Sequence, residues 1–168
     1  VASGQGCVLA PGQLPCTVQG IKIAGKAAAT APPGEAVELQ LTGISNPADV
    51  PCGAILADAA DPVLATSKFK ASLDLVATAR PITVGFQGVV HLHASTVEGE
   101  IAKIVDATDP VTGVVTDKPK AVKGGQKATV VFQLKENIAM EAQGRFSMFV
   151  FRFEDSTVGA GRVLDMPR

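Results

Sequence analysis

The stretch that decides the fold runs from FKASLDL, beginning at Phe69, to TVGAG, ending at Gly161, and it carries an ordered series of turn and strand markers. Many of the markers contain glycine or proline, the residues that most often separate one strand from the next. In order they are Phe69-Lys-Ala71, Pro81-Ile82, Gly85-Phe86, His91-Leu-His93, Thr112-Gly113, Lys118-Pro-Lys-Ala-Val-Lys123, Gly125-Gln126, Ile138, Glu141, Gly144-Arg-Phe146 and Thr157-Val-Gly-Ala-Gly161. Such a series favours short strands joined by turns.

Alternation of apolar and polar residues predicts strands over Val37–Thr42 and Ala128–Leu134, and a further strand is expected at about Cys16–Ile23. Phe69–Leu75 alternates in the same way, but its apolar spacing also fits one face of a helix. Periodicity alone leaves that segment open between strand and helix.

The segment Phe146–Phe153 is apolar at successive positions. This pattern predicts a central strand covered on both faces and almost completely buried. Arg145 and Arg152 lie on either side of its apolar run, Phe146–Phe151, and arginine with aromatic residues is a composition typical of interfaces. Core packing is the favoured role for the phenylalanines, whereas the arginines are equally compatible with a partner contact and with a flanking role.

The composition allows one large domain or two small ones. The chain has 168 residues, 46% of them hydrophobic, and its 17 glycines and 11 prolines disfavour long helices. Asn46-Pro47, Pro51 and Asp61-Pro62 interrupt the apolar content between residues 45 and 62 and argue against regular strand pairing there. We therefore predict a boundary near residues 62–67, with domains 1–65 and 66–168.

Charge and cysteine content exclude several functions. The net charge of −1 gives no overall attraction to phosphate, so no DNA partner is expected and any RNA contact needs a local patch. Cys7, Cys16 and Cys52 form no C-x-x-C pair, and an odd number of cysteines suits a reducing, cytoplasmic location. The uncharged runs at residues 1–21 and 81–97 are broken by glycine, proline and glutamine, so a soluble protein without a membrane partner is predicted. A first residue Val rather than Met fits a fragment or a processed product.

Motifs for catalysis or metal binding are not found. The phosphate-binding pattern G-x-x-x-x-G-K-[ST] does not occur, and residues 124–127 (GGQK) fit a turn before a strand, so the chain is not expected to hydrolyse GTP. His91 and His93, two apart on an expected strand, would share a face, but no third metal ligand is evident. Ser95 and Asp106 lie near them without a G-x-S-x-G nucleophile elbow. We predict no enzyme activity, no catalytic residue and no metal site.

A run of lysines, Lys118, Lys120 and Lys123, concentrates positive charge in an expected loop. Such a cluster could contact ribosomal RNA or an acidic protein surface. The more common role of loop lysines is solvation, and it remains the favoured alternative.

The ordered markers resemble the third domain of the translational GTPases related to elongation factor 1-alpha, elongation factor Tu and eukaryotic release factor 3. Within this superfamily they resemble most the ribosome-rescue GTPases that partner Pelota, through Pro81-Ile-Thr83, Gly85-Phe86 and the segment from Thr112 to Gln126. The first segment resembles the second barrel of the same proteins. The matching pieces are Cys16-Thr-Val-Gln-Gly-Ile21, Pro33-Gly34-Glu35, Val37–Leu41 and the glycine of Pro51-Cys-Gly53.

The resemblance implies an all-β fold of two antiparallel barrels in series. The first would be incomplete, because family members open it with strands upstream of Val1, and the second would be a closed six-stranded Greek-key barrel. We expect the incomplete barrel to be the less stable of the two.

The resemblance also implies a role. These barrels would bind a tRNA-shaped protein of the Pelota or release-factor class for delivery to the ribosome, while GTP and Mg²⁺ would be held by a separate GTPase domain. The region around the Gly-Arg-Phe motif gives Arg145, Phe146, Arg152 and Thr157 as partner-binding candidates. The motif aligns either at Gly144-Arg-Phe146 or at Ser147-Met-Phe149, with Arg152 aligned in both cases.

Three other functions stay open at this stage. An elongation factor region that binds aminoacyl-tRNA would show a steep salt dependence. An extracellular β-sandwich module would contain oxidised cysteines. A nucleotide-using enzyme would show measurable affinity for GTP.

Overall fold

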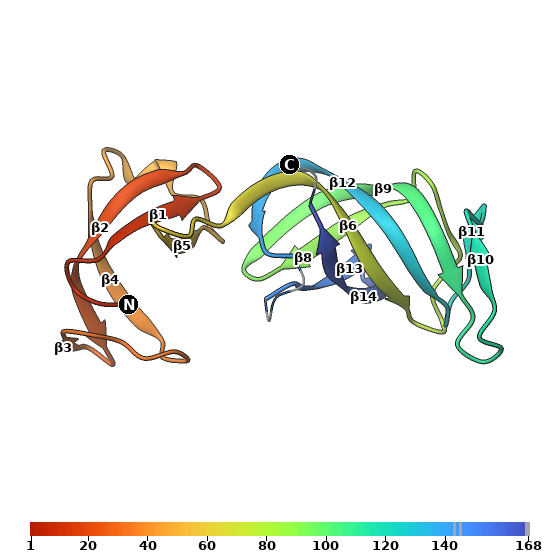
Figure 1. Ribbon diagram of the computed structural model, residues 1–168, viewed down its shortest axis with the longest axis horizontal. Helices are drawn as coiled ribbons and strands as arrows, with labels where there is room; N and C mark the ends of the chain where they lie inside the picture. Colours follow the sequence, from red (N-terminus) through yellow and green to blue (C-terminus); the bar gives the residue numbers. More distant parts are fainter. Residues whose placement is uncertain (143, 145, 167–168) are drawn as a thin grey trace. The chain divides into compact units, whose positions relative to one another are not determined.

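The computed structural model describes residues 1–142, 144 and 146–166 and consists almost entirely of β-strands. The chain divides into two compact units, Val1–Val63 and Leu64–Arg168 (Figure 1). A single 3-10 turn, Pro47–Asp49, is the helical element of the described residues. Among these residues, no helix has the length and apolar character needed to cross a membrane.

The second unit is a closed barrel. Six strands form a ring in the order β9-β12-β6-β14-β13-β8, and β8 closes it by pairing with β9 as well as with β13. Strands β8, β9 and β12 lie side by side in chain order, and β6, which precedes them, lies beside β12, as in a Greek key. The predicted closed six-stranded barrel is confirmed. Its strands and their short neighbours are β6 (Leu64–Leu75), β7 (Ile82–Thr83), β8 (Gln87–Leu92), β9 (Ser95–Thr108), β10 (Val115–Asp117), β11 (Ala121–Val122), β12 (Lys127–Met140), β13 (Met148–Phe153) and β14 (Ser156–Asp165).

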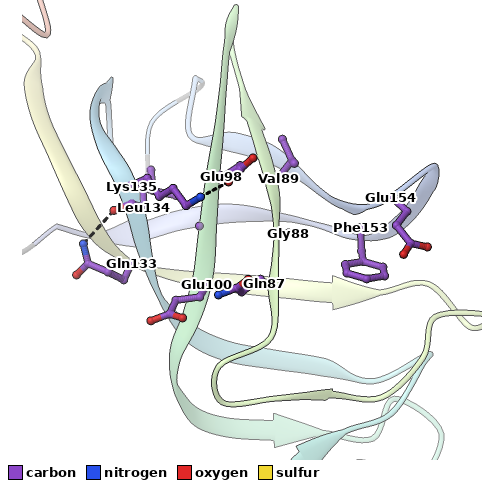
Figure 2. A pocket seen from close by; sticks show the side chains of 11 residues that line it. Gln87, Gly88, Val89, Glu98, Glu100, Gln133, Leu134, Lys135, Phe153 and Glu154 are labelled. Carbon is purple, nitrogen blue, oxygen red and sulfur yellow. Dashed lines mark hydrogen bonds and ion pairs between the residues drawn. The ribbon is translucent and has the colours of Figure 1, made fainter.

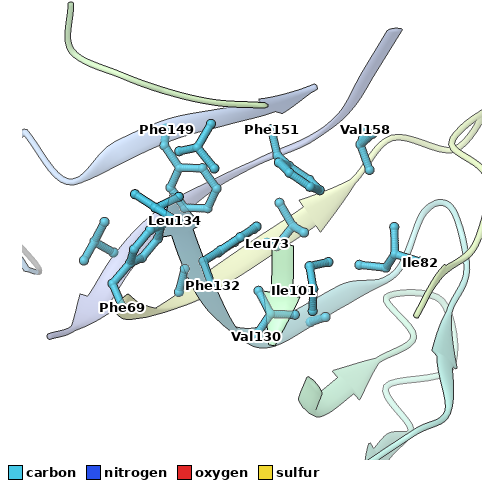
Figure 3. Packing of buried hydrophobic residues seen from close by; sticks show 14 of the residues in the cluster. Phe69, Leu73, Ile82, Ile101, Val130, Phe132, Leu134, Phe149, Phe151 and Val158 are labelled. Atoms are coloured by element: carbon cyan, nitrogen blue, oxygen red, sulfur yellow. The ribbon is translucent and has the colours of Figure 1, made fainter. Parts of the chain in front are cut away.

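Aromatic rings from three strands fill the barrel interior (Figure 3). The Phe132 ring of β12 lies 5.2 Å from that of Phe69 on β6 and 5.0 Å from that of Phe151 on β13, measured between ring centroids. The Phe149 ring contacts both Phe69 and Phe132 edge-on. Such contacts add to the free energy gained by burying the rings, by about 0.5–1.5 kcal/mol per pair.

Alternation decides which residues face this core. The segment left open between strand and helix is a strand, because every second residue of β6 from Phe69 to Leu75 is buried. The predicted strand at Ala128–Leu134 is confirmed as part of β12, with Ala128, Val130, Phe132 and Leu134 inside.

The expectation of nearly complete burial for Phe146–Phe153 is wrong. Phe149 and Phe151 are buried, but Phe146, Met148 and Val150 are 59%, 56% and 37% exposed. One face of a barrel strand packs against the core. The other face of β13 is not covered by any described segment of this unit. The apolar composition of this segment therefore marks an exposed surface as well as a core strand.

Glycine is needed where β14 lies closest to its neighbours. A Cβ added at Gly161 would lie 2.0 Å from the backbone oxygen of Ser72 on β6 and 2.9 Å from the ring of Phe149. The backbone oxygen cannot rotate away, so any larger residue would force the two strands apart.

The first unit is an open sheet. Strand β1 pairs with β2 and β5, and β2 also pairs with β3 and β4, so β3, β4 and β5 each pair with one named strand. Its buried core is small and consists of Cys7, Leu9, Cys16, Val18, Ile21 and Ala31. The strands are β1 (Gly6–Ala10), β2 (Leu14–Ile23), β3 (Lys26–Ala28), β4 (Val37–Thr42) and β5 (Ile55–Asp58).

Two sequence predictions for this unit have different outcomes. The strand at Val37–Thr42 is confirmed as β4. The argument against regular pairing between residues 45 and 62 is wrong, because Ile55–Asp58 pairs with β1 as β5. A strand of four residues fits between the prolines without using a proline nitrogen in its ladder.

Gly161→Ala is predicted to destabilise the barrel by about 1–3 kcal/mol, because the added methyl group overpacks the contact with Ser72. Chemical denaturation followed by circular dichroism measures the change. The control is Ala160→Ser at the adjacent exposed position, where a change within about 0.5 kcal/mol is expected. Equal stability of Gly161→Ala and the unsubstituted protein would show that the strands do not approach this closely.

Native-state hydrogen exchange should distinguish the two units. Backbone amides of β2 are expected to exchange faster than those of β12, because β2 belongs to an open sheet over a small core. Exchange followed by mass spectrometry measures both strands in one sample. Slower exchange in β2 than in β12 would contradict the expected order of stability.

Candidate functional site

The outward side of β13 exposes an apolar row beside two arginines. Met148 lies opposite Arg162 of β14, and Val150 lies opposite Ala160 of β14 and His91 of β8. Residues directly opposite one another in a sheet point to the same side. We call this surface the β13 face and define it by Phe146, Met148, Val150, Arg152, Ala160, Arg162 and His91.

The composition of the β13 face is typical of an interface. Phe146, Met148 and Val150 are exposed, and an aromatic residue and a methionine are enriched where proteins contact one another. Arg152 and Arg162 supply charge at its margins. Singly scattered exposed apolar residues are ordinary, but Met148 and Val150 occupy successive outward positions of β13, and Phe146 lies just before the strand.

Arg152 is held in place at the end of this apolar row. Its Nη2 donates a hydrogen bond to the backbone oxygen of Asp155, 3.0 Å away across the β13–β14 turn. Its Nε is buried and has no hydrogen-bond partner among the described residues. A buried donor without a hydrogen-bond partner costs free energy, so the Arg152 side chain is not fully satisfied within the barrel.

The sequence-predicted partner residues lie at different points of the β13–β14 hairpin. Arg152 and the exposed Thr157 are directly opposite each other on the two strands. Phe146 precedes the other end of β13, roughly 20 Å from Arg152 along an extended chain. Arg145 lies outside the described residues.

A groove next to Thr157 brings in a residue that sequence reasoning missed. Arg80 and Phe153 line it with Thr157, and its volume is about 460 Å³. The Arg80 guanidinium lies 4.8 Å from the centre of the Phe153 ring, a cation–π contact. The contact joins segments far apart in the chain, so no local pattern signals it. Met148, Val150 and Arg162 were also missed, and the four successive apolar residues from Met148 to Phe151 give no signal of which face is outward.

A second groove lies over the β8–β9–β12 part of the barrel and is lined by both polar and apolar side chains (Figure 2). Its volume is about 390 Å³. Lys135 forms an ion pair with Glu98, and this hydrogen bond holds the pKa of the Glu98 carboxyl below its usual value and raises the pKa of Lys135. Glu100 and Glu154 also line the groove. Of the predicted partner residues that the structure describes, Phe146, Arg152 and Thr157 do not line this groove.

The predicted lysine cluster lies on the exposed segment from β10 to just beyond β11. Lys118, Lys120 and Lys123 are exposed, and none of them forms an ion pair with another described residue. Two backbone N–H groups hold the segment: that of Lys118 donates to the backbone oxygen of Val105, and that of Lys123 donates to Oε1 of Gln126, each at 2.9 Å. These lysines do not belong to the β13 face.

The two histidines do not share one strand face as expected. His91 is on β8, where its Nδ1 lies 3.2 Å from Thr96 Oγ1. His93 follows the strand in a left-handed turn with φ of 54°, and its ring lies 6.1 Å from that of Phe146. Among the described residues, no group of three or more His, Cys, Asp or Glu side chains could hold a metal ion.

Comparison with known proteins identifies relatives of this barrel. The model of the elongation factor Tu C-terminal domain family matches residues 62–166. Elongation factor 1-alpha of Staphylothermus marinus is 29% identical over 140 residues, which cover 81% of this chain and 32% of that protein. The protein of the same name from Aeropyrum pernix is 31% identical over 143 residues, with the same coverage. The chain thus spans about a third of the length of the curated relatives it matches.

Solved structures show the same fold. The crystal structure of sup35 complexed with GDP matches with a TM-score of 0.89 at 22% identity, over 100% of this chain and 42% of that one. The structure of sup35 complexed with GMPPNP gives the same values.

Lys135→Met is predicted to raise the pKa of Glu98 towards its usual value, because the hydrogen bond that lowers it is lost. In the unsubstituted protein the ion pair is present at neutral pH and is lost as the pH falls through the depressed Glu98 pKa. NMR titration of the carboxyl carbons measures this.

Asp58 is the control carboxyl, because the backbone N–H of Ala60 and the side chain of Gln5 lower its pKa without Lys135. Its pKa should not change in the variant. A Glu98 pKa that stays the same in Lys135→Met would show that the ion pair does not form in solution.

Proposed function

We infer the function of this chain from the family to which it belongs, the elongation factor Tu C-terminal domain family, whose model covers residues 62–166. The barrel is a C-terminal domain of the type found in translational GTPases related to elongation factor 1-alpha and release factor 3. It is a binding domain and not a catalytic one.

In this proposal the β13 face binds a tRNA-shaped decoding protein of the Pelota or release-factor class, in ribosome rescue or termination. The observation that carries the proposal is the exposed row of Phe146, Met148 and Val150, bordered by Arg152. Interface residues that contribute most binding energy lie near a well-packed centre, and arginine is enriched among them. The partner would supply an apolar surface that covers this row.

The barrel would act by holding its partner in a fixed position. A closed barrel has no free strand edge that rearranges, so its exposed side chains keep a constant geometry. A separate GTPase domain, with GTP and Mg²⁺, would contact the barrels differently in its two nucleotide states and so time the release of the partner at the ribosome. This role implies a cytoplasmic protein.

Aminoacyl-tRNA is the second candidate partner, because elongation factor 1-alpha proteins are the curated relatives compared above. Lys118, Lys120 and Lys123 carry exposed charge that could contact a phosphate backbone. Binding of tRNA through them would weaken steeply with rising salt concentration, whereas binding through the apolar β13 face would not.

Val150→Asp is predicted to weaken binding of a purified Pelota-like or release-factor-like protein by at least about tenfold, because it places a charge in the apolar row. Arg152→Ala should weaken the same complex by about tenfold. Isothermal titration calorimetry measures both affinities, and thermal unfolding checks that the variants fold.

The matched control is Val115→Asp, an equal change at an exposed valine of β10. It should leave the affinity for the decoding proteins unchanged. The proposal is wrong if the unsubstituted protein retains neither class of decoding protein, or if Val150→Asp binds as tightly as the control. Retention of aminoacyl-tRNA alone would favour the second candidate.

A further inference from the structure

Two cysteines lie directly opposite each other in the first unit. Cys7 of β1 and Cys16 of β2 are Cα partners in the antiparallel ladder. Both thiols are free, and both side chains are buried in the small core of this unit, at 3% and 6% exposure. The third cysteine, Cys52, is exposed and lies outside this pair.

The geometry of the ladder brings these two residues within reach of a covalent bond. Directly opposite residues of antiparallel strands have Cα atoms about 4.5 or 5.5 Å apart, depending on the type of pair. Disulfides form between Cα atoms about 4.4–6.8 Å apart, so both spacings are suitable. We propose that Cys7 and Cys16 form a reversible disulfide that fastens β1 to β2.

The surroundings of the thiols determine when this reaction occurs. Burial raises the pKa of both thiols, and Asp58 raises that of Cys7 further. Few thiolates are therefore present in the closed unit, and an oxidant has little access to them. Glutathione reaches a thiol when β1 and β2 separate transiently, as strands of an open sheet do, and the bond closes when the strands pair again.

The oxidant is a small-molecule disulfide such as oxidised glutathione. One cysteine thiolate attacks a glutathione sulfur, which breaks the glutathione S–S bond and releases one glutathione thiolate. The second cysteine then attacks the mixed disulfide, forms the Cys7–Cys16 bond and releases the second glutathione thiolate. Two protons leave the cysteine thiols and protonate the two glutathione thiolates, and two electrons pass to glutathione.

The position of the pair gives the bond a structural effect. Among the named strands, β5 is joined to the sheet only through β1, and β1 meets β2 along the short stretch from Gly6 to Leu9. A covalent bond within this stretch ties β1 and β5 to the part of the sheet formed by β2, β3 and β4. Oxidation would therefore stabilise the unit that has the smaller core.

The test uses the full chain with Cys52→Ser, which removes the exposed thiol and leaves the core unchanged. The protein is incubated with oxidised glutathione, quenched in acid, alkylated and digested for mass spectrometry. The expected product is a cross-link between the Cys7 and Cys16 peptides, reversed by dithiothreitol. Hydrogen exchange of β1 and β2 should be about tenfold slower in the cross-linked form.

Cys7→Ala and Cys16→Ala, each in the Cys52→Ser background, should instead retain glutathione on the remaining cysteine. Two results would overturn the inference. One is glutathione on Cys7 and Cys16 without a bond between them. The other is a cross-link that leaves the exchange of β1 and β2 unchanged.

Discussion

The pairing of β8 with both β9 and β13 is the constraint on which the second unit depends. It turns a row of six strands into a closed ring, so that each of these strands has two neighbours. Closure requires close approach between strands, which the absence of a side chain permits at Gly161. It also requires a filled interior, which is provided by Phe69, Phe132, Phe149 and Phe151. The same closure directs every second residue of β13 outward. The exposed surface and the core are thus two consequences of one strand arrangement.

Strands with regular alternation of polar and apolar residues were predictable from the sequence, because only the apolar face of such a strand can pack against the core. The segments Val37–Thr42 and Ala128–Leu134 are of this kind. Closure of the ring was expected only through resemblance, since it depends on pairs far apart in the chain. Strand β5 was missed because its four residues, Ile55–Asp58, lie in a segment between Pro51 and Pro62, where the prolines argued against pairing. The burial of Phe146–Phe153 was predicted wrongly, because the sequence does not distinguish an apolar face exposed to solvent from an apolar face that is buried.

The candidate site was predictable in part. Arg152 and Thr157 were named from the motif region, and the structure places them opposite each other on the β13–β14 hairpin. Met148 and Val150 could not be assigned to the surface without knowing that β13 has one covered side. The contact of Arg80 with Phe153 joins distant segments and has no local signature. The periodicity of a sequence predicts which strands alternate, but it does not predict contacts between segments far apart in the chain.

The central claim, that the outward side of β13 is the docking surface of a rigid barrel, is tested most directly by methyl NMR of the methionines. Met148 is 56% exposed on the β13 face, while Met140 is fully buried in the same barrel and serves as the internal reference. The account predicts that adding a purified Pelota-like or release-factor-like protein shifts or broadens the Met148 signal and leaves Met140 in place. An unchanged Met148 signal in the presence of saturating bound partner would contradict it.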